Sequence, residues 1–170
     1  MSTGKVCAVF GFGPGIGSAT ARKWSSEGFK VALLSRNLEK VTASAADIPA
    51  SKGFACDVTD PKSIESAVAN IENDLGPIHT IIYNAGNGVW KTWDTIDLDL
   101  FDMAMKTNVH GLLKTTQTVA PGMNFFVSAC DSPNFYVVHY LSDGTVLIFS
   151  SCCVEFIFIS NITPFYYLTT

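Results

Sequence analysis

Short apolar runs alternate with segments of helical periodicity along most of the chain. The runs are predicted to be β-strands, because each is short, mostly apolar and bounded by turn or polar residues; they cover residues 6–10, 30–35, 53–56, 80–83 and 145–150. The helical segments between them cover residues 16–28, 38–48, 61–75 and 98–119. Strands that alternate with helices favour parallel strands joined by right-handed crossovers. The pattern therefore predicts an α/β fold, a doubly wound parallel sheet.

Residues at the helix boundaries support these limits. Asn37 and Asp60 are preferred helix-capping residues, and Pro61 suits the first turn of a helix. Gly28 and Gly76 stand just past the ends of two predicted helices, where glycine is common. A chain of 170 residues without an internal repeat is expected to form one domain with a sizeable core.

The turn after the first strand is rich in glycine and has the sequence GFGPGIG. Glycine allows a sharp turn and a close approach of the backbone to a pyrophosphate, and the following helix N-terminus offers N–H donors. The common G-x-G-x-x-G spacing is absent, but G-x-x-x-G-x-G fits at Gly11, Gly15 and Gly17, with Ile16 between the last two. The motif indicates a dinucleotide site, although a glycine-rich turn without a ligand is the alternative interpretation.

The end of the second strand carries Ser35, Arg36 and Asn37, where an NAD-binding protein would have an acidic residue for the ribose hydroxyls. The guanidinium of Arg36 has a fixed fork of donors that suits the 2′-phosphate of NADP. Ser35 and Asn37 are expected to add hydrogen bonds. The alternative is a solvated arginine at a helix start. With the glycine turn beside it, the segment favours NADP over NAD.

Four further motifs follow the glycine turn in order. They are CDVTD at 56–60, NAG at 84–86, KTNVHG at 106–111 and GTVLIFSS at 144–151. With these motifs the chain resembles the short-chain dehydrogenase/reductase family of NAD(P)-dependent oxidoreductases. The resemblance implies a Rossmann-like sheet of strand order 3-2-1-4-5. It also implies hydride transfer between NADP(H) and a carbonyl or alcohol substrate.

The resemblance implies a role for each motif in the cofactor site. Asp57 is expected to meet the adenine ring, with Val58 packed beside it. The segment Asn84, Ala85 and Gly86 is expected to steady the sheet beside the cofactor.

Two residues are implied for catalysis. Asn108 matches the asparagine that kinks the long helix and holds a water of the family's proton relay, and Ser151 aligns with the serine that binds the substrate. The family also uses a tyrosine and a lysine spaced Y-x-x-x-K, since a phenol needs a nearby cation to act near neutral pH.

No Y-x-x-x-K motif is present in this sequence. The last positive charge is Lys114, and the tyrosines after it are Tyr136, Tyr140, Tyr166 and Tyr167. A lysine from elsewhere, such as Lys91 or Lys106, would have to replace the missing cation. The alternative to an oxidoreductase is therefore a catalytically inactive NADP-binding remnant.

The composition changes after residue 122. Residues 123–170 hold 11 of the 20 aromatic residues but only three charged ones, Asp131, Asp143 and Glu155. We predict a dinucleotide-binding domain at 1–151 with an atypical insertion at about 124–143, and a divergent apolar tail at 152–170. The sheet is expected to be incomplete at its C-terminal side, which predicts low solubility or self-association unless the tail covers the exposed apolar surface. Alternation at 154–160 favours an added edge strand or a disordered end.

Charge and residue spacing argue against other classes of function. The net charge is −4 and the basic residues are scattered, which disfavours nucleic acid as a partner. The apolar stretch at 147–168 is interrupted by Glu155, Asn161 and Pro164, so a membrane segment is not expected. The five cysteines and three histidines lack metal-ligand spacing. No secretory leader precedes the first strand, so a cytoplasmic location is the expectation.

Overall fold

The computed structural model describes residues 4–86, 91–92 and 94–122, together with the backbone of three later strands. The strands are β1 (Val6–Phe10), β2 (Lys30–Ser35), β3 (Ser51–Ala55), β4 (Ile78–Tyr83), β5 (Tyr136–Tyr140), β6 (Val146–Ser150) and β7 (Ile157–Ile159). The helices are α1 (Ile16–Ser26), α2 (Leu38–Ala45), α3 (Pro61–Asp74), α4 (Leu98–Met105) and α5 (Gly111–Val119). A π-helical turn, Lys106–His110, joins α4 to α5, and a short 3-10 turn, Ala120–Gly122, follows α5.

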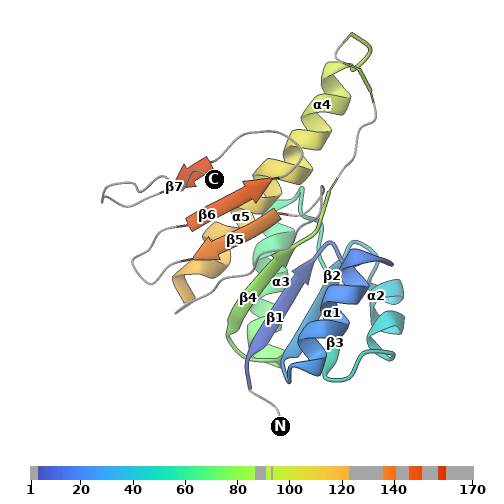
Figure 1. Cartoon of the computed structure of the whole chain (residues 1–170), viewed down its shortest axis with the longest axis vertical. Coiled ribbons are helices and arrows are strands. Elements are labelled where there is room, and N and C mark those ends of the chain that lie inside the picture. The colour runs from blue at the N-terminus through green and yellow to red at the C-terminus, as the bar shows by residue number, and fades with distance from the viewer. Residues whose placement is uncertain are drawn as a thin grey trace, which may run out of the picture.

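The first four strands form a parallel sheet in the order β3-β2-β1-β4, which confirms the predicted order for this part. Helices α1 and α2 cover one face of this sheet, and α3 and α5 cover the other (Figure 1). Strand β1 is buried on both faces: Val6, Ala8 and Phe10 belong to the core under α3 and α5, while Cys7 and Val9 belong to the core under α1 and α2. This double burial is expected of a central parallel strand.

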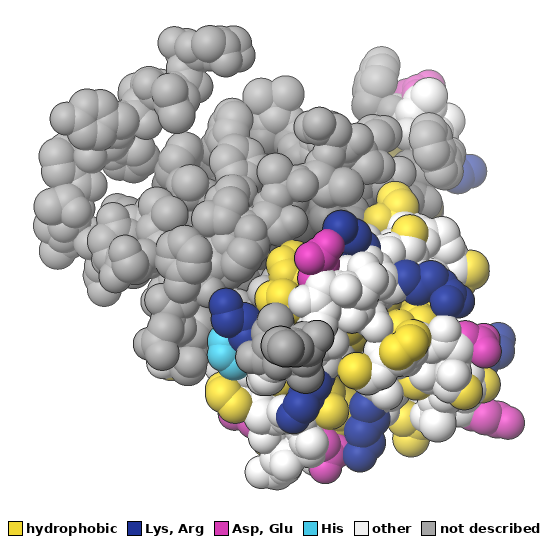
Figure 2. All heavy atoms as spheres, turned by 60° about the horizontal axis from the view of Figure 1, so that its bottom comes forward, with side chains coloured by type: hydrophobic (Ala, Val, Ile, Leu, Met, Phe, Trp, Pro, Cys, Tyr) yellow, Lys and Arg dark blue, Asp and Glu magenta, His cyan; other side chains and the backbone are white. Residues whose placement is uncertain are grey.

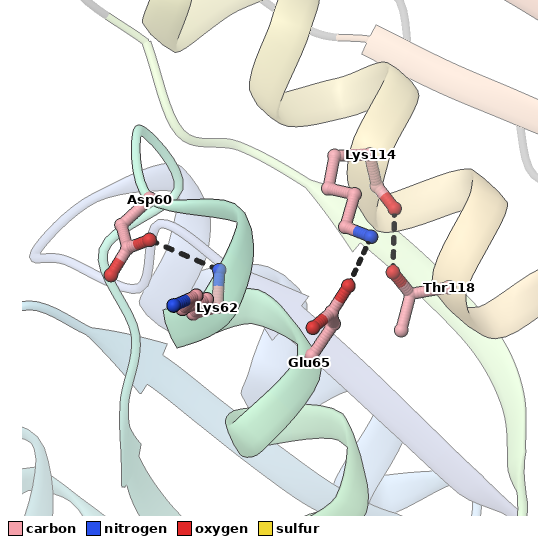
Figure 3. Close-up of polar contacts among 5 residues, drawn as sticks. All are labelled: Asp60, Lys62, Glu65, Lys114 and Thr118. Carbon is pink, nitrogen blue, oxygen red and sulfur yellow. Dashed lines mark hydrogen bonds and ion pairs between the residues drawn. The ribbon is translucent and has the colours of Figure 1, made fainter.

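The predicted helix boundaries are confirmed at their N-terminal ends. The side-chain oxygen of Asn37 accepts the Lys40 N–H at 2.9 Å, and that of Asp60 accepts the Lys62 N–H at 3.0 Å (Figure 3). Gly28 has a φ of 85° beyond α1, a conformation that glycine adopts readily. The helices end two or three residues earlier than predicted at α1 and α2, because turns with short-range hydrogen bonds replace the last predicted turn.

Helices α3 and α5 pack side by side on the sheet. Lys114 of α5 forms an ion pair with Glu65 of α3, and the Thr118 hydroxyl donates to the Lys114 carbonyl at 2.8 Å (Figure 3). An exposed pair of this kind contributes little, on the order of 0–1 kcal/mol. The buried residues of the two helices, such as Ile64 and Leu112, therefore account for most of the stability of this contact.

The strand beside β4 differs from the prediction. The strand predicted at 145–150 is present as β6, but β5 lies between it and β4. The pairing of β4 with β5 and the pairing of β5 with β6 are both antiparallel. Strand β5 comes from the segment predicted to be an insertion. Only residues 141–145 separate β5 from β6, and a connection this short permits a hairpin but not a parallel crossover. Of the two alternatives for 154–160, an added edge strand or a disordered end, the strand is observed: β7 covers Ile157–Ile159 and is antiparallel to β6.

Charged side chains on the described surface are mixed in sign. On the face shown in Figure 2, Lys and Arg side chains alternate with Asp and Glu side chains among polar and apolar surface. Among the described residues, no helix is long and apolar enough to cross a membrane.

Candidate dinucleotide site

The carboxyl ends of β1, β2 and β4 meet at one edge of the parallel sheet, where ligands of doubly wound folds bind. The segments that leave these three strands are 11–17, 36–37 and 84–86. They hold most of the residues predicted to bind a cofactor. The fold therefore brings these distant parts of the chain to one edge.

The glycine turn is held against both neighbouring strands. The N–H groups of Gly11 and Phe12 donate to the Leu34 carbonyl at 3.1 and 2.7 Å. Gly11 has a φ of 81°, and a Cβ added there would lie 2.7 Å from the carbonyl carbon of Asn84 and closer still to the backbone of Ala85. Glycine is required at this position, because both the backbone angle and the space exclude a side chain.

Asn84 ties the exit of β4 to the glycine turn. Its backbone N–H donates to the Phe10 carbonyl at 2.8 Å, and its side-chain amide donates to the Gly11 carbonyl at 3.0 Å. Gly17 lies next to the same amide, since a Cβ at Gly17 would be 3.3 Å from Asn84 Nδ2. These contacts link the exit of β4 to the glycine turn, and the role of the Asn-Ala-Gly segment beside a cofactor stays a prediction.

The N-terminus of α1 is open to an anion. The residue at its N-cap is Gly15, with a φ of 95°, and no side chain caps the helix. The first turn, which begins with Ile16 and Gly17, contains no acidic residue. The partial positive charge of the helix end is therefore not neutralised by an acidic side chain of the first turn or by a side-chain cap.

Arg36 is exposed at the end of β2, on the strand next to the glycine turn. The neighbouring side chains are partly engaged in local structure: the Ser35 hydroxyl donates to the Asn37 carbonyl at 3.1 Å, and the Asn37 side-chain oxygen caps α2. The Asn37 amide group and the lone pairs of the Ser35 hydroxyl retain hydrogen-bonding capacity for a ligand. The guanidinium is thus the main charged group of this segment.

Asp57 is held in a fixed orientation after β3. Its carboxylate accepts the Thr59 N–H at 2.9 Å and the Thr59 hydroxyl at 2.7 Å, and its own N–H donates to the Ser63 hydroxyl at 2.9 Å. The Thr59 backbone hydrogen bond, with the Thr59 hydroxyl and the charge of Arg36, lowers the pKa of Asp57. The lowered pKa keeps the carboxylate ionised near neutral pH.

This arrangement predicts a pH dependence. A carboxyl with a lowered pKa in the folded state stabilises the fold above its unfolded value of about 3.9, and that stabilisation is lost as the pH falls through the folded value. An NMR titration of the Asp57 side chain is expected to give a midpoint below the ordinary aspartate value. Thr59→Val should raise this midpoint partway, because the backbone hydrogen bond remains. Thr95→Val is the control and should leave the midpoint unchanged, because among the described residues the Thr95 hydroxyl bonds with Thr92. An unshifted midpoint in Thr59→Val would contradict the assignment.

Asn108 lies in the π-helical turn between α4 and α5. The departure from α-helical geometry that the family resemblance implies at this asparagine is therefore present. Its side-chain oxygen is 3.8 Å from the position that a Cβ at Gly86 would occupy, so it faces the end of the 84–86 segment. A π turn within a helix is frequently found at a functional site. Ser151, the predicted substrate-binding residue, lies outside the described residues, as do residues 152–156 and 160–170 of the tail predicted at 152–170.

Three contributors to the site were missed by the sequence motifs. Thr59 and Ser63 fix the Asp57 segment, and Tyr83 donates its hydroxyl to the Thr107 carbonyl in the π turn at 2.5 Å. The Asp-x-Thr spacing was a usable signal, since an aspartate commonly accepts from a backbone N–H two residues later. No local pattern indicated the Tyr83 contact, because it spans 24 residues.

Two cysteines of the described part of the chain are buried beneath this edge of the sheet or within its core. Cys7 and Cys56 are buried free thiols, and burial raises the pKa of Cys56 to about 12. A thiol with so high a pKa is a poor nucleophile. Within the described part of the chain, no group of three or more His, Cys, Asp or Glu residues is placed to hold a metal ion.

The chain is similar in sequence to known proteins. A family model described as short chain dehydrogenase matches residues 5–129. Carbonyl reductase family member 4 of Xenopus laevis is 42% identical over 82 residues, which are 48% of this chain and 35% of that protein. Sorbitol dehydrogenase of Cereibacter sphaeroides is 36% identical over 121 residues, which are 71% of this chain and 47% of that protein. The chain thus spans between about a third and a half of the length of these relatives.

Solved structures agree with the sequence comparison. An actinorhodin polyketide ketoreductase, solved with NADPH, matches 72% of this chain and 49% of its own chain, with a TM-score of 0.68 and 26% identity. A short-chain dehydrogenase/reductase of Serratia marcescens matches 71% of this chain and 51% of its own, with a TM-score of 0.66 and 26% identity. Since the family model covers most of the chain, this protein belongs to the short-chain dehydrogenase/reductase family of oxidoreductases.

Proposed function

We propose that this chain binds NADP(H) across the carboxyl edge of β1, β2 and β4. Two features at the same edge of the sheet support the proposal. The N-terminus of α1 behind the glycine turn is uncapped, and the exposed Arg36 stands at the end of the adjacent strand β2. Two anionic groups would be met there, a pyrophosphate at α1 and a 2′-phosphate at Arg36. The NADPH found with the similar actinorhodin ketoreductase supports this choice of cofactor.

The residues of the edge fit the parts of this cofactor. The backbone of Gly15, Ile16 and Gly17 would hold the pyrophosphate with its N–H donors, and the two glycines would allow a close approach because they have no side chain. The oriented carboxylate of Asp57 would accept from the adenine amino group, with Val58 packed against the ring. Arg36 would select the phosphorylated ribose, and no acidic side chain replaces it at the end of β2.

The proposed reaction is hydride transfer between NADP(H) and a carbonyl or alcohol substrate, as the names of the carbonyl reductase and sorbitol dehydrogenase relatives suggest. Bound NADPH would supply the hydride. Asn108 would hold water beside the 84–86 segment, and Ser151 would polarise the substrate oxygen. Within these 170 residues no Y-x-x-x-K pair is present to supply the proton.

The missing pair favours a second candidate function, which is NADP binding without turnover. A phenol with a pKa near 10 transfers protons poorly near neutral pH when no cation stabilises its phenolate. An assay of NADPH oxidation with simple aldehydes and ketones distinguishes the two candidates. Turnover that saturates with substrate supports the oxidoreductase, and NADPH binding without turnover supports the inactive binder.

Cofactor choice gives a separate prediction. The chain is expected to bind NADPH more tightly than NADH, because only NADPH carries the phosphate that Arg36 can pair with. Arg36→Ala should weaken NADPH binding by at least about tenfold and leave NADH binding within about twofold, since a charge-assisted hydrogen bond contributes about 1.5–3 kcal/mol. Titrations followed by fluorescence measure both affinities. Arg22→Ala is the control, because Arg22 donates to the Asp47 carbonyl far along α1; equal losses for both cofactors in Arg36→Ala would contradict the proposal.

A further inference from the structure

Tyr83 makes a contact that joins the sheet to the helix carrying Asn108. It is the last residue of β4, its side chain is 1% exposed, and it directly precedes the Asn84 segment. Its hydroxyl donates to the Thr107 carbonyl at 2.5 Å. A buried hydroxyl thus reaches the backbone of the π turn beside Asn108.

The geometry of the π turn explains why this donor is needed. In an α-helix the Gly111 N–H would donate to the Thr107 carbonyl, four residues earlier. Here the Gly111 N–H donates to the Lys106 carbonyl, five residues earlier. The Thr107 carbonyl therefore loses its α-helical donor, and the Tyr83 hydroxyl takes that place. Thr107 is partly buried, and a carbonyl shielded from water without a partner is costly, so the hydroxyl stabilises the π turn relative to a regular α-helix.

Gly111 allows the helix to come this close. A Cβ at Gly111 would lie 2.6 Å from the Val58 carbonyl oxygen, 3.2 Å from the Val58 Cβ and closer still to the Tyr83 hydroxyl. The π turn is consequently packed against the end of β4 and against the segment proposed to receive the adenine ring. Asn108 is held on the β4 side of the glycine turn, facing Gly86.

We propose that Tyr83 is a positioning residue for the half of the cofactor that lies over β4. Its hydroxyl keeps the π turn in register and thereby fixes Asn108 against the 84–86 segment. This inference rests on the proposed NADP(H) site. The adenine half of the cofactor would lie over β2 and β3, at Arg36 and Asp57, and the nicotinamide half on the opposite side of β1, towards β4.

The two halves can be tested separately with NADPH and with 2′,5′-ADP, which lacks the nicotinamide half. Tyr83→Phe keeps the ring in the core and removes only the hydroxyl. It is expected to weaken NADPH binding about five- to tenfold and to leave 2′,5′-ADP binding within about twofold. Thr116→Val is the matched control, because Thr116 is also buried and its hydroxyl also donates to a carbonyl of the same helix, that of Leu112 at 3.0 Å. The control should change neither affinity.

Each outcome decides a different point. Equal weakening of both ligands, or no weakening of either, would overturn the positioning role of Tyr83. Failure of the unaltered chain to bind 2′,5′-ADP would instead overturn the proposed cofactor site.

If Tyr83→Phe binds neither ligand, backbone amide hydrogen exchange of this variant without ligand provides a second measurement. Faster exchange confined to the amides of residues 106–112 would support the inference. A loss of protection across the whole sheet would show that the hydroxyl supports the fold in general, and would overturn the inference.

Discussion

Gly11→Ala is expected to destabilise the protein by about 3 kcal/mol or more. Left-handed backbone angles cost a residue with a side chain about 1–2 kcal/mol, and overpacking in a tight site adds about 1–3 kcal/mol. Both apply at Gly11, which has a φ of 81° and meets the backbone of Asn84 and Ala85 where a Cβ would stand. Backbone atoms cannot rotate away as a flexible side chain would. Urea denaturation of the Gly11→Ala variant and of the unaltered chain measures the difference in their free energies of unfolding.

Gly13→Ala is the matched control for this prediction. Gly13 belongs to the same turn, has no positive φ, and has no atom within 4 Å of an added Cβ. Its substitution is expected to change stability by less than about 0.5 kcal/mol, as for an ordinary surface position. If Gly11→Ala and Gly13→Ala were equally stable, the close contact between the glycine turn and the Asn84 segment would be wrong.

Gly111→Ala is expected to destabilise the protein by about 2 kcal/mol, against the usual direction of this change. Alanine in place of glycine inside a helix normally stabilises by about 0.5–1 kcal/mol. At Gly111 the new Cβ would press on the Val58 carbonyl oxygen at 2.6 Å and on the Tyr83 hydroxyl, and overpacking of this kind costs about 1–3 kcal/mol. Thermal or urea unfolding of the variant and of the unaltered chain shows directly whether the substitution lowers or raises the stability.

A double-mutant cycle separates the two contacts of Gly111. In a Tyr83→Phe background the nearest atom to the new Cβ is gone, so Gly111→Ala should cost less than it does in the unaltered chain. The remaining cost is assigned to Val58. A stabilising effect of Gly111→Ala in both backgrounds would contradict the close packing between α5, β4 and the Asp57 segment.

The parallel half of the fold could be predicted because its burial pattern and its local signals agree. The fully apolar run at Val6–Phe10 has the composition of a strand buried on both faces, and it lies between α1, α2 on one side and α3, α5 on the other. Asn37 and Asp60 cap the helices that they were predicted to cap. Agreement between pattern and capping chemistry made this part of the fold predictable.

The limits of the strands could not be predicted as well. Strand β4 begins at Ile78, two residues before its predicted start, because the polar side chain of His79 forms a hydrogen bond inside the sheet. Its Nδ1 atom accepts the Val6 N–H at 3.2 Å, next to an irregularity in the pairing of β1 with β4. Apolar periodicity contains no signal for a side chain that replaces a backbone acceptor. The position of β5 was missed for a related reason, since pairing partners are not encoded in local pattern.

The candidate site was predictable where a motif reflects the backbone conformation of a single short segment. Gly11, Gly15 and Gly17 form the turn that their spacing indicates, and Gly11 and Gly15 have positive φ values. The roles of Tyr83 and Gly111 depend on contacts between segments far apart in the chain. The sequence shows them only as a core aromatic residue and a helix glycine, and a glycine within a helix would by itself suggest a weak point rather than a close contact.

The most direct test of the proposed site is to map NADPH binding on the backbone amides of this chain by NMR. We expect saturable shifts concentrated at residues 13–17, at Arg36, at 57–58 and at 84–86, all at the carboxyl edge of the sheet. We expect no shifts at the opposite edge, around Lys30 and Gly76. Absent shifts, or shifts centred on that opposite edge, would contradict a dinucleotide site in this chain.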